Sequence, residues 1–321
     1  MTVPGIGWAA IRRLRRCLGP LDRVPPAAVA QLRVVEGIPG RLLVDIADAL
    51  SATPCSATAE RLATEYRLLE AHSASIVLRG ERRYPPSLQE LYDPPELLFA
   101  QGDYEPARDP IAVAIVGTRW PTAYGRLVAG KLAAELSALG ITIVSGLARG
   151  IDAEAHSAAL RPKGGRTIAV LGSGLGKLYP TEHAELAERI SENGAILSEL
   201  LPSTPPRPGH FPRRNRIIAA LGLGVVVVEA PERSGALITA REAIDVGRDV
   251  FAIPGNVTSR NSIGSNRLIK DGAYLVEDFR DIISVLEPRI RRFTPPAPRG
   301  SRPGDAPDQI ADSGDPRSLP I

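Results

Sequence analysis

Aliphatic runs recur through the middle of the chain, and each run ends at a glycine, serine or alanine-proline turn. The runs cover residues 111–116, 141–144, 167–171, 195–197, 225–229 and 250–253. Continuous apolar runs are typical of strands that are covered on both faces. Between the first two runs, Val128, Leu132 and Leu136 share one helical stripe and Gly140 supplies a stop. The pattern therefore predicts strands that alternate with helices.

Strand, glycine loop, helix and strand in succession form a βαβ unit. Its repetition predicts an α/β fold with a doubly wound, mostly parallel sheet. In this architecture the loops that follow the strands gather at one edge. We therefore expect one crevice to be lined by residues 117–119, 145–150, 172–176, 211–216, 234–235 and 254–255.

The ends of the chain have a different character, which divides it into four predicted segments. Residues 1–75 are expected to be helical, with glycine turns at 4–7 and 36–40 that resemble those of helix-hairpin-helix or SAM-like modules. A plain helix-turn-helix packing unit is the alternative that we slightly favour, so DNA contact there stays open. Residues 76–108 are rich in proline and predict a connector that docks on a core domain at 109–287. Residues 288–321 predict a disordered tail, too short and polar for a winged helix.

Composition narrows the class of protein. With 44% hydrophobic and 23% charged residues the chain is globular, and its net charge of +3 permits an anionic partner without demanding one. Cys17 and Cys55 suggest free thiols in a reducing cytoplasm. No stretch reaches the length of a membrane span, and the four scattered histidines predict no metal. No cofactor is expected.

The segment 211–216, FPRRNR, concentrates candidate binding chemistry. Arg213, Arg214 and Arg216 can bind phosphates, and Phe211 can stack on a base. A buried ion-pair cluster would need acids nearby, and the first downstream acid is Glu229. An ordinary solvated basic turn is the alternative.

Catalytic signatures are weaker. The loop after the first strand, GTRWPTAYG, is not the GxGxxG of dinucleotide sites, and GSGLGKL at 172–178 departs from a P-loop. Asp152 and His156 lie four residues apart on an expected helix. They could form an acid–base dyad, although we favour a helix-stabilising hydrogen bond. The residue types suit binding better than chemistry, so no enzyme is predicted.

Ordered motifs from residue 84 to 286 resemble the bacterial DNA-processing protein family DprA, also called Smf. They include YPPSL at 84–88, DPPELLFAQG at 93–102, IVGTR at 115–119, SGLARGIDAEAHSAAL at 145–160, TIAVLGSGL at 167–175, FPRRNRIIAAL at 211–221, SGALITA at 234–240, GRDVFAIPG at 247–255 and GSNRLIKDGA at 264–273.

The resemblance implies an extended Rossmann-like domain that binds single-stranded DNA. It also implies protection of incoming DNA in natural transformation (competence), loading of RecA recombinase for DNA recombination, and a homodimer. Matched position by position, the DNA-binding residues would be Gly117, Thr118, Arg119, Ser145, Gly146, Arg149, Phe211, Arg213, Arg214, Asn215, Arg216, Ser234, Gly235 and Thr239.

Two alternatives to a DNA-binding mediator stay open. The sheet, Arg216 and the Ser234-Gly235 turn also resemble nucleotide-phosphate-binding hydrolases of the LOG and lysine-decarboxylase-like group, although ERSGALITA lacks their paired glycines. A scaffold with an incidental basic crevice is the other.

Overall fold

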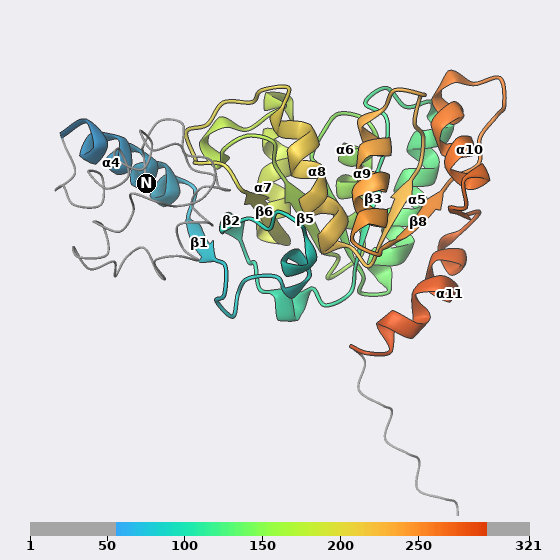
Figure 1. The fold of residues 1–321 in the computed structure, drawn as a ribbon, viewed down its shortest axis with the longest axis horizontal. Helices are drawn as coiled ribbons and strands as arrows, with labels where there is room; N and C mark the ends of the chain where they lie inside the picture. Colours follow the sequence, from blue (N-terminus) through green and yellow to red (C-terminus); the bar gives the residue numbers. More distant parts are fainter. Residues whose placement is uncertain (1–55, 294–321) are drawn as a thin grey trace, which may run out of the picture.

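A computed structural model of the chain describes residues 56–293 (Figure 1). Of the segment 1–75, for which helices are predicted, it describes helix α4 (Ser56–Ala71) and the short link to the first strand. The glycine turns at 4–7 and 36–40, both cysteines and the tail from residue 294 lie outside the described residues.

Nine strands of the described part form a single sheet with the order β1-β2-β6-β5-β4-β3-β7-β8-β9. They are β1 (Ala74–Leu78), β2 (Leu97–Gly102), β3 (Ala112–Val116), β4 (Thr142–Ser145), β5 (Thr167–Val170), β6 (Gly194–Ser198), β7 (Gly224–Val227), β8 (Asp249–Ala252) and β9 (Tyr274–Leu275). Neighbours from β6 to β9 are parallel, whereas β1 and β2 are antiparallel. The predicted α/β fold with a mostly parallel sheet is confirmed, and the sheet is mixed at one edge.

Helices cover both faces of the sheet (Figure 1). They are α5 (Ala123–Ala138), α6 (Ile151–Ala159), α7 (Ala184–Glu192), α8 (His210–Leu221), α9 (Gly235–Asp245), α10 (Ile263–Lys270) and α11 (Phe279–Ile290). Alternate residues of β3 show the two layers: Ala114 packs in the cluster with α8 and α9, and Ile115 in the cluster with α5, α6 and α11. Because both faces of β3 are buried, its run has no polar positions.

The segment 76–108, which its prolines mark as a connector, contributes to the same sheet. Strand β1 begins at Ala74 and ends at Leu78 within this segment, and β2 pairs with β6 in the register Phe99↔Ser198. Tyr84 is buried and its hydroxyl donates to the carbonyl of Pro95 at 2.8 Å. Four of its prolines stand between the two strands and Pro106 follows β2, so they interrupt neither strand, and the sheet begins well before residue 109.

The last helix continues beyond the boundary at residue 288. Pro288 lies inside α11, which ends at Ile290. A proline in the last turn removes one helical hydrogen bond and no following turn depends on it. Arg289 anchors this turn by donating to the carbonyl of Gly247 at 2.9 Å. The predicted disorder from residue 288 is therefore wrong for residues 288–290.

Candidate nucleic-acid interface

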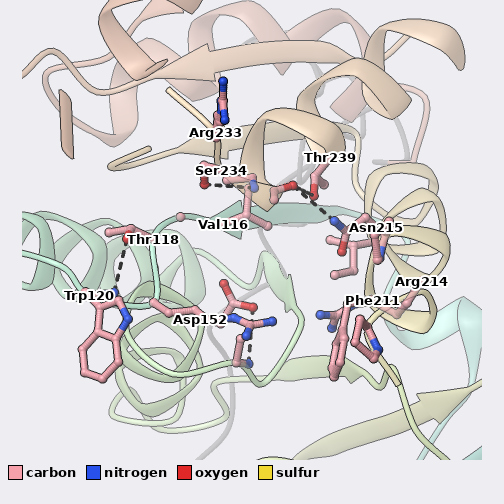
Figure 2. Close-up of a pocket in the computed structure, with 18 of the residues that line it drawn as sticks. Val116, Thr118, Trp120, Asp152, Phe211, Arg214, Asn215, Arg233, Ser234 and Thr239 are labelled. Carbon is pink, nitrogen blue, oxygen red and sulfur yellow. Dashed lines mark hydrogen bonds between the residues drawn. The ribbon is translucent and has the colours of Figure 1, made fainter. Parts of the chain in front are cut away.

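A pocket opens at the carboxyl edge of the sheet, where the loops after β3, β4 and β7 meet the first turns of α8 and α9 (Figure 2). Its volume is about 660 Å³. Strand β4 lies on one side of β3 and β7 on the other, so the strand order reverses here. In doubly wound sheets this reversal separates the loops and leaves a crevice for a ligand. We call it the cationic pocket, because its charged lining residues are Arg119, Arg207, Arg214, Arg233 and Asp152.

Most of the predicted binding residues meet here. They line the cationic pocket or a small adjoining cavity that shares Arg119 and Phe211 with it. These residues are Gly117, Thr118, Arg119, Gly146, Arg149, Phe211, Arg214, Asn215, Ser234, Gly235 and Thr239. The topology therefore brings together loops that are far apart in the sequence.

Arg214 is the most buried cation of the pocket, with 7% of its surface exposed. The segment FPRRNR, expected among the loops, begins helix α8, and Pro212 stands in its first turn, where a missing N–H costs no bond. The Arg214 guanidinium lies against Gly146 and donates to the carbonyl of Val170. Burial lowers the pKa of Arg214 to about 10, while the Asp152 charge opposes this shift. Arg214 is therefore charged at neutral pH.

The loop after β4 is held by two buried side chains of α6. Asp152 Oδ2 accepts from the amides of Gly146 at 3.1 Å and Ala148 at 3.4 Å, and His156 Nε2 accepts from the amide of Leu147 at 3.3 Å. These bonds hold Leu147 at a φ of +54°, a left-handed conformation that costs a leucine of order 1 kcal/mol or more. The amides point inward and do not face a ligand.

The same contacts decide the role of the Asp152 and His156 pair. Within the described residues the two side chains bind loop amides and not each other, so the expected helix-stabilising bond is wrong and no dyad forms. The Thr167 hydroxyl donates to the carbonyl of Ile143, so it accepts from His156 Nδ1 at 2.7 Å. This network suits a neutral imidazole. Burial accordingly lowers the pKa of His156 to about 3, and burial raises the pKa of Asp152.

Rings and guanidinium groups alternate along one rim. The Arg119 guanidinium lies 5.3 Å from the centre of the Phe211 ring, and the Tyr179 ring is 5.7 Å from that of Phe211. Arg149 lies 5.7 Å from the Tyr179 ring centre and pairs with Glu182 at 2.5 Å. Contacts with rings restrict the arginine side chains without neutralising them, whereas Glu182 compensates the charge of Arg149. Arg119 therefore keeps its charge at the mouth of the pocket.

The first turn of α9 forms the opposite wall. Ser234 caps this helix by accepting from the amide of Ala236 at 3.3 Å. Asn215 and Thr239 both donate to the carbonyl of Gly235, at 3.2 and 3.4 Å. A helix N-terminus carries partial positive charge, which adds to that of Arg233 and Arg214. The wall therefore favours an anion.

Three predicted residues do not line the pocket. Ser145 is buried in β4 and donates to the carbonyl of Ile115 at 2.6 Å. Arg216 is 9% exposed and one of its nitrogens lies 2.7 Å from both oxygens of Glu199, while Arg213 lies 3.4 Å from Glu199. The acid that these arginines need is upstream, at the end of β6. The expectation that no acid stands near them is wrong.

The expected single crevice is also divided. Pro254 and Gly255 line a second cavity of about 510 Å³ together with Thr122, Tyr124 and Glu229. Glu229 Oε2 accepts from the amide of Thr122 at 2.9 Å and Oε1 from its hydroxyl at 2.5 Å. Since Thr122 caps α5, Glu229 fixes the loop that carries Arg119. Gly172 and Gly174 are buried, and Gly172 lies against Phe211.

Several lining residues lie outside the segments that were expected to line the crevice. They are Val116, Trp120, Asp152, Tyr179, Pro206, Arg207, Pro208, Ile218, Pro231, Arg233 and Ala236. Ala148 and Pro212 lie within those segments but were not among the predicted binding residues. Trp120 could have been found, because it directly follows the Gly117–Arg119 turn. Arg207 lies in a loop with no pattern, so local sequence offers no signal for it.

Two features of residues 56–293 bear on other functions. No group of three or more His, Cys, Asp or Glu side chains between residues 56 and 293 is arranged to hold a metal ion. Over the same range, every helix is too short or too polar to cross a membrane.

Comparison with known proteins identifies the family. Residues 75–287 match the family model described as DNA recombination-mediator protein A. DNA processing protein DprA of Bacillus subtilis is 44% identical over 217 residues, which cover 68% of this chain and 73% of that protein.

Two solved structures show the same likeness. The crystal structure of DprA from Streptococcus pneumoniae has a TM-score of 0.64 at 37% identity, covering 87% of this chain and 98% of that one. DNA processing protein A of Helicobacter pylori, whose structure is described for its single-stranded DNA binding mode, has a TM-score of 0.61 at 33% identity, covering 67% and 96%. The chain belongs to the DNA recombination-mediator protein A family, DprA or Smf.

Proposed function

We propose that this chain binds single-stranded DNA, with the sugar-phosphate backbone in the cationic pocket. The observation that carries this proposal is the convergence of Arg119, from the loop after β3, with Arg214, from α8, on one cavity. Among residues 56–293, Asp152 is the one acid that lines that cavity, and it binds two loop amides. The pocket therefore offers more positive charge than the protein neutralises. A nucleic acid backbone supplies matching negative charge at regular intervals.

Binding without catalysis fits the contacts of the candidate acid and base. Asp152 and His156 are occupied by the loop after β4, and burial keeps the imidazole neutral. We therefore propose a mediator and not a hydrolase of nucleotides. Incubation with nucleoside monophosphates should release no free base.

The family membership supports a wider role in the cytoplasm. We propose that the chain protects DNA strands that enter during natural transformation, loads RecA recombinase onto them, and acts as a homodimer. Residues 109–287 would carry the DNA-binding surface. Native mass measurement tests the dimer, and strand exchange by RecA in the presence of a single-strand-binding protein tests loading.

Fluorescence anisotropy with labelled oligo-dT tests the central proposal. The protein should bind oligo-dT more tightly than duplex DNA of equal length at moderate salt, if one unpaired strand occupies the pocket as proposed. Arg119→Gln and Arg214→Gln should each weaken binding to every sequence alike and lower the slope of log K against log salt by about 1. Arg280→Gln, at an exposed arginine of α11, is the matched control. Equal affinity for duplex DNA, or full affinity in both pocket variants, would contradict the proposal.

A further inference from the structure

Trp120 is an exposed aromatic side chain at the mouth of the cationic pocket, with 79% of its surface accessible. A ligand that covered this indole would remove a large apolar surface from water, which is favourable, and its aromatic face can stack on another ring. Figure 2 shows the indole at the end of the pocket away from Phe211, with Asp152 between them. The pocket therefore has a ring at each end.

The backbone that carries this indole is fixed. The amide of Trp120 donates to the Thr118 hydroxyl at 3.2 Å, and its carbonyl accepts from the side chain of Asn261 at 2.8 Å. Pro121 follows, and a residue before proline is restricted to extended backbone. Little backbone entropy would therefore be lost if a ligand covered the indole.

Phe211 is less suited to receive a base. It is half-buried, with the Arg119 guanidinium over its ring, the Tyr179 ring tilted at 55° beside it and Gly172 against its edge. A base could stack on the ring face that Arg119 covers only by displacing that guanidinium. Trp120 has no such neighbour recorded among the described residues, and its indole is open to solvent.

We propose that the Trp120 indole stacks on an unpaired base of the nucleic acid strand whose backbone occupies the cationic pocket. This inference rests on the proposed function and adds a subsite for one nucleobase at the end of the pocket away from Phe211. Stacking accepts any base, since each has a π-face. A base held in a duplex cannot offer that face, so the subsite contributes to the preference for single strands.

Intrinsic fluorescence can test the contact directly, because the chain has only two tryptophans, Trp8 and Trp120. In a Trp8→Phe background, oligo-dT should quench the Trp120 emission to a plateau at stoichiometric DNA. An oligonucleotide of the same length made of abasic residues should bind through its phosphates and quench little.

Affinity measurements complete the experiment. Trp120→Ala leaves both backbone contacts of this residue in place, so the fold should persist, which the thermal midpoint checks. We expect it to weaken oligo-dT binding about 5- to 100-fold, with an unchanged salt slope and no effect on abasic DNA. Trp120→Phe should recover part of the loss. Tyr66→Ala, which removes an exposed ring on α4, is the control and should bind as the unsubstituted chain.

The outcomes separate the two proposals. If Arg214→Gln weakens oligo-dT binding while Trp120→Ala does not, and no quenching occurs, the stacking subsite is wrong and the DNA-binding function stands. If the loss in Trp120→Ala is equal on abasic DNA, the indole acts on the loop and not on a base, which also overturns the inference. If the unsubstituted chain does not bind oligo-dT at all, the proposed function fails first.

Discussion

The guanidinium of Arg214 lies directly against the backbone of Gly146, so that a methyl group added to this glycine would overlap it. The contact joins α8 to the loop after β4, and Arg214 itself donates to the carbonyl of Val170 in β5. A single side chain therefore ties together three elements of the pocket. Its position depends on the absence of a Cβ at residue 146.

Gly146→Ala should displace Arg214 and weaken the binding of single-stranded DNA. Gly146 does not have a positive φ, so alanine is compatible with its backbone and the main effect is steric. A displaced Arg214 would lose its hydrogen bond to the DNA backbone. Loss of one hydrogen bond to a charged group costs about 1.5 to 3 kcal/mol, or ~10- to 150-fold in Kd. Anisotropy titration gives the Kd. Gly209→Ala, where a Cβ would meet open space, is the control, and an equal loss there would contradict this mechanism.

The buried pair of Arg216 and Glu199 should govern stability and not DNA binding. Arg216→Met leaves the Glu199 carboxylate in the interior with Arg213 at 3.4 Å as its remaining partner. Removal of one member of a buried ion pair costs about 3 to 5 kcal/mol. Urea unfolding should show this loss, while DNA affinity of the folded protein stays near that of the unsubstituted chain.

A second substitution provides the check on that pair. Adding Glu199→Gln removes the uncompensated charge and should recover part of the lost stability. A double variant no more stable than Arg216→Met would mean that lost packing, and not the buried charge, causes the effect.

The arginines of FPRRNR show what the sequence could predict and what it could not. A helix turns by about 100° per residue, so side chains two positions apart project in nearly opposite directions. Arg214 therefore lines the pocket and Arg216 points to Glu199, although both look alike in the sequence. The sequence shows the cluster of arginines. Which of them face the pocket and which face Glu199 depends on the helix that begins at His210.

The strands can be predicted from consecutive residues, whereas several contacts of the site join residues that are far apart in the sequence. Aliphatic runs gave strands such as β3 and β7, because burial on both faces leaves no polar positions. Their parallel order placed Arg119 and Arg214 at one sheet edge. The acid partner of Arg216 comes from β6, 17 residues upstream, and a pairing across the fold leaves no periodic trace. The same holds for Asn261, which fixes Trp120 from 141 residues away.

Glu229→Gln should loosen the loop that carries Arg119. Both carboxylate oxygens accept bonds from Thr122, at 2.9 and 2.5 Å, and an amide has only one accepting oxygen. The amide N–H of Thr122 or its hydroxyl then loses a charged partner, at a cost of about 1.5 to 3 kcal/mol. Denaturant unfolding measures this loss, and DNA binding should weaken with it. The exposed Glu192→Gln is the control, and unchanged stability in Glu229→Gln would refute this account.

The buried His156 should make stability depend on pH. Burial lowers its pKa from 6.5 to about 3, because a charged imidazole would lose water and face the charge of Arg214. Between these two pH values His156 is protonated in the unfolded chain and neutral in the folded chain. The contribution of neutral His156 to the free energy of unfolding is therefore complete above about pH 6.5. It is lost as the pH falls towards 3, and the free energy then changes by up to about 1.4 kcal/mol per pH unit.

A difference measurement isolates this contribution from that of the carboxylates. His156→Gln keeps a side-chain oxygen that can accept from the amide of Leu147 but removes the titrating ring. Its stability should be lower than that of the unsubstituted chain at pH 7, because the bond to Thr167 is strained or lost, and the gap should narrow as the pH falls from 6.5. Urea unfolding at several pH values gives this gap, the difference in free energy of unfolding between the two proteins. A gap that stays constant down to pH 4 would show that His156 is protonated in the folded protein, against the network in which its Nε2 accepts a hydrogen bond.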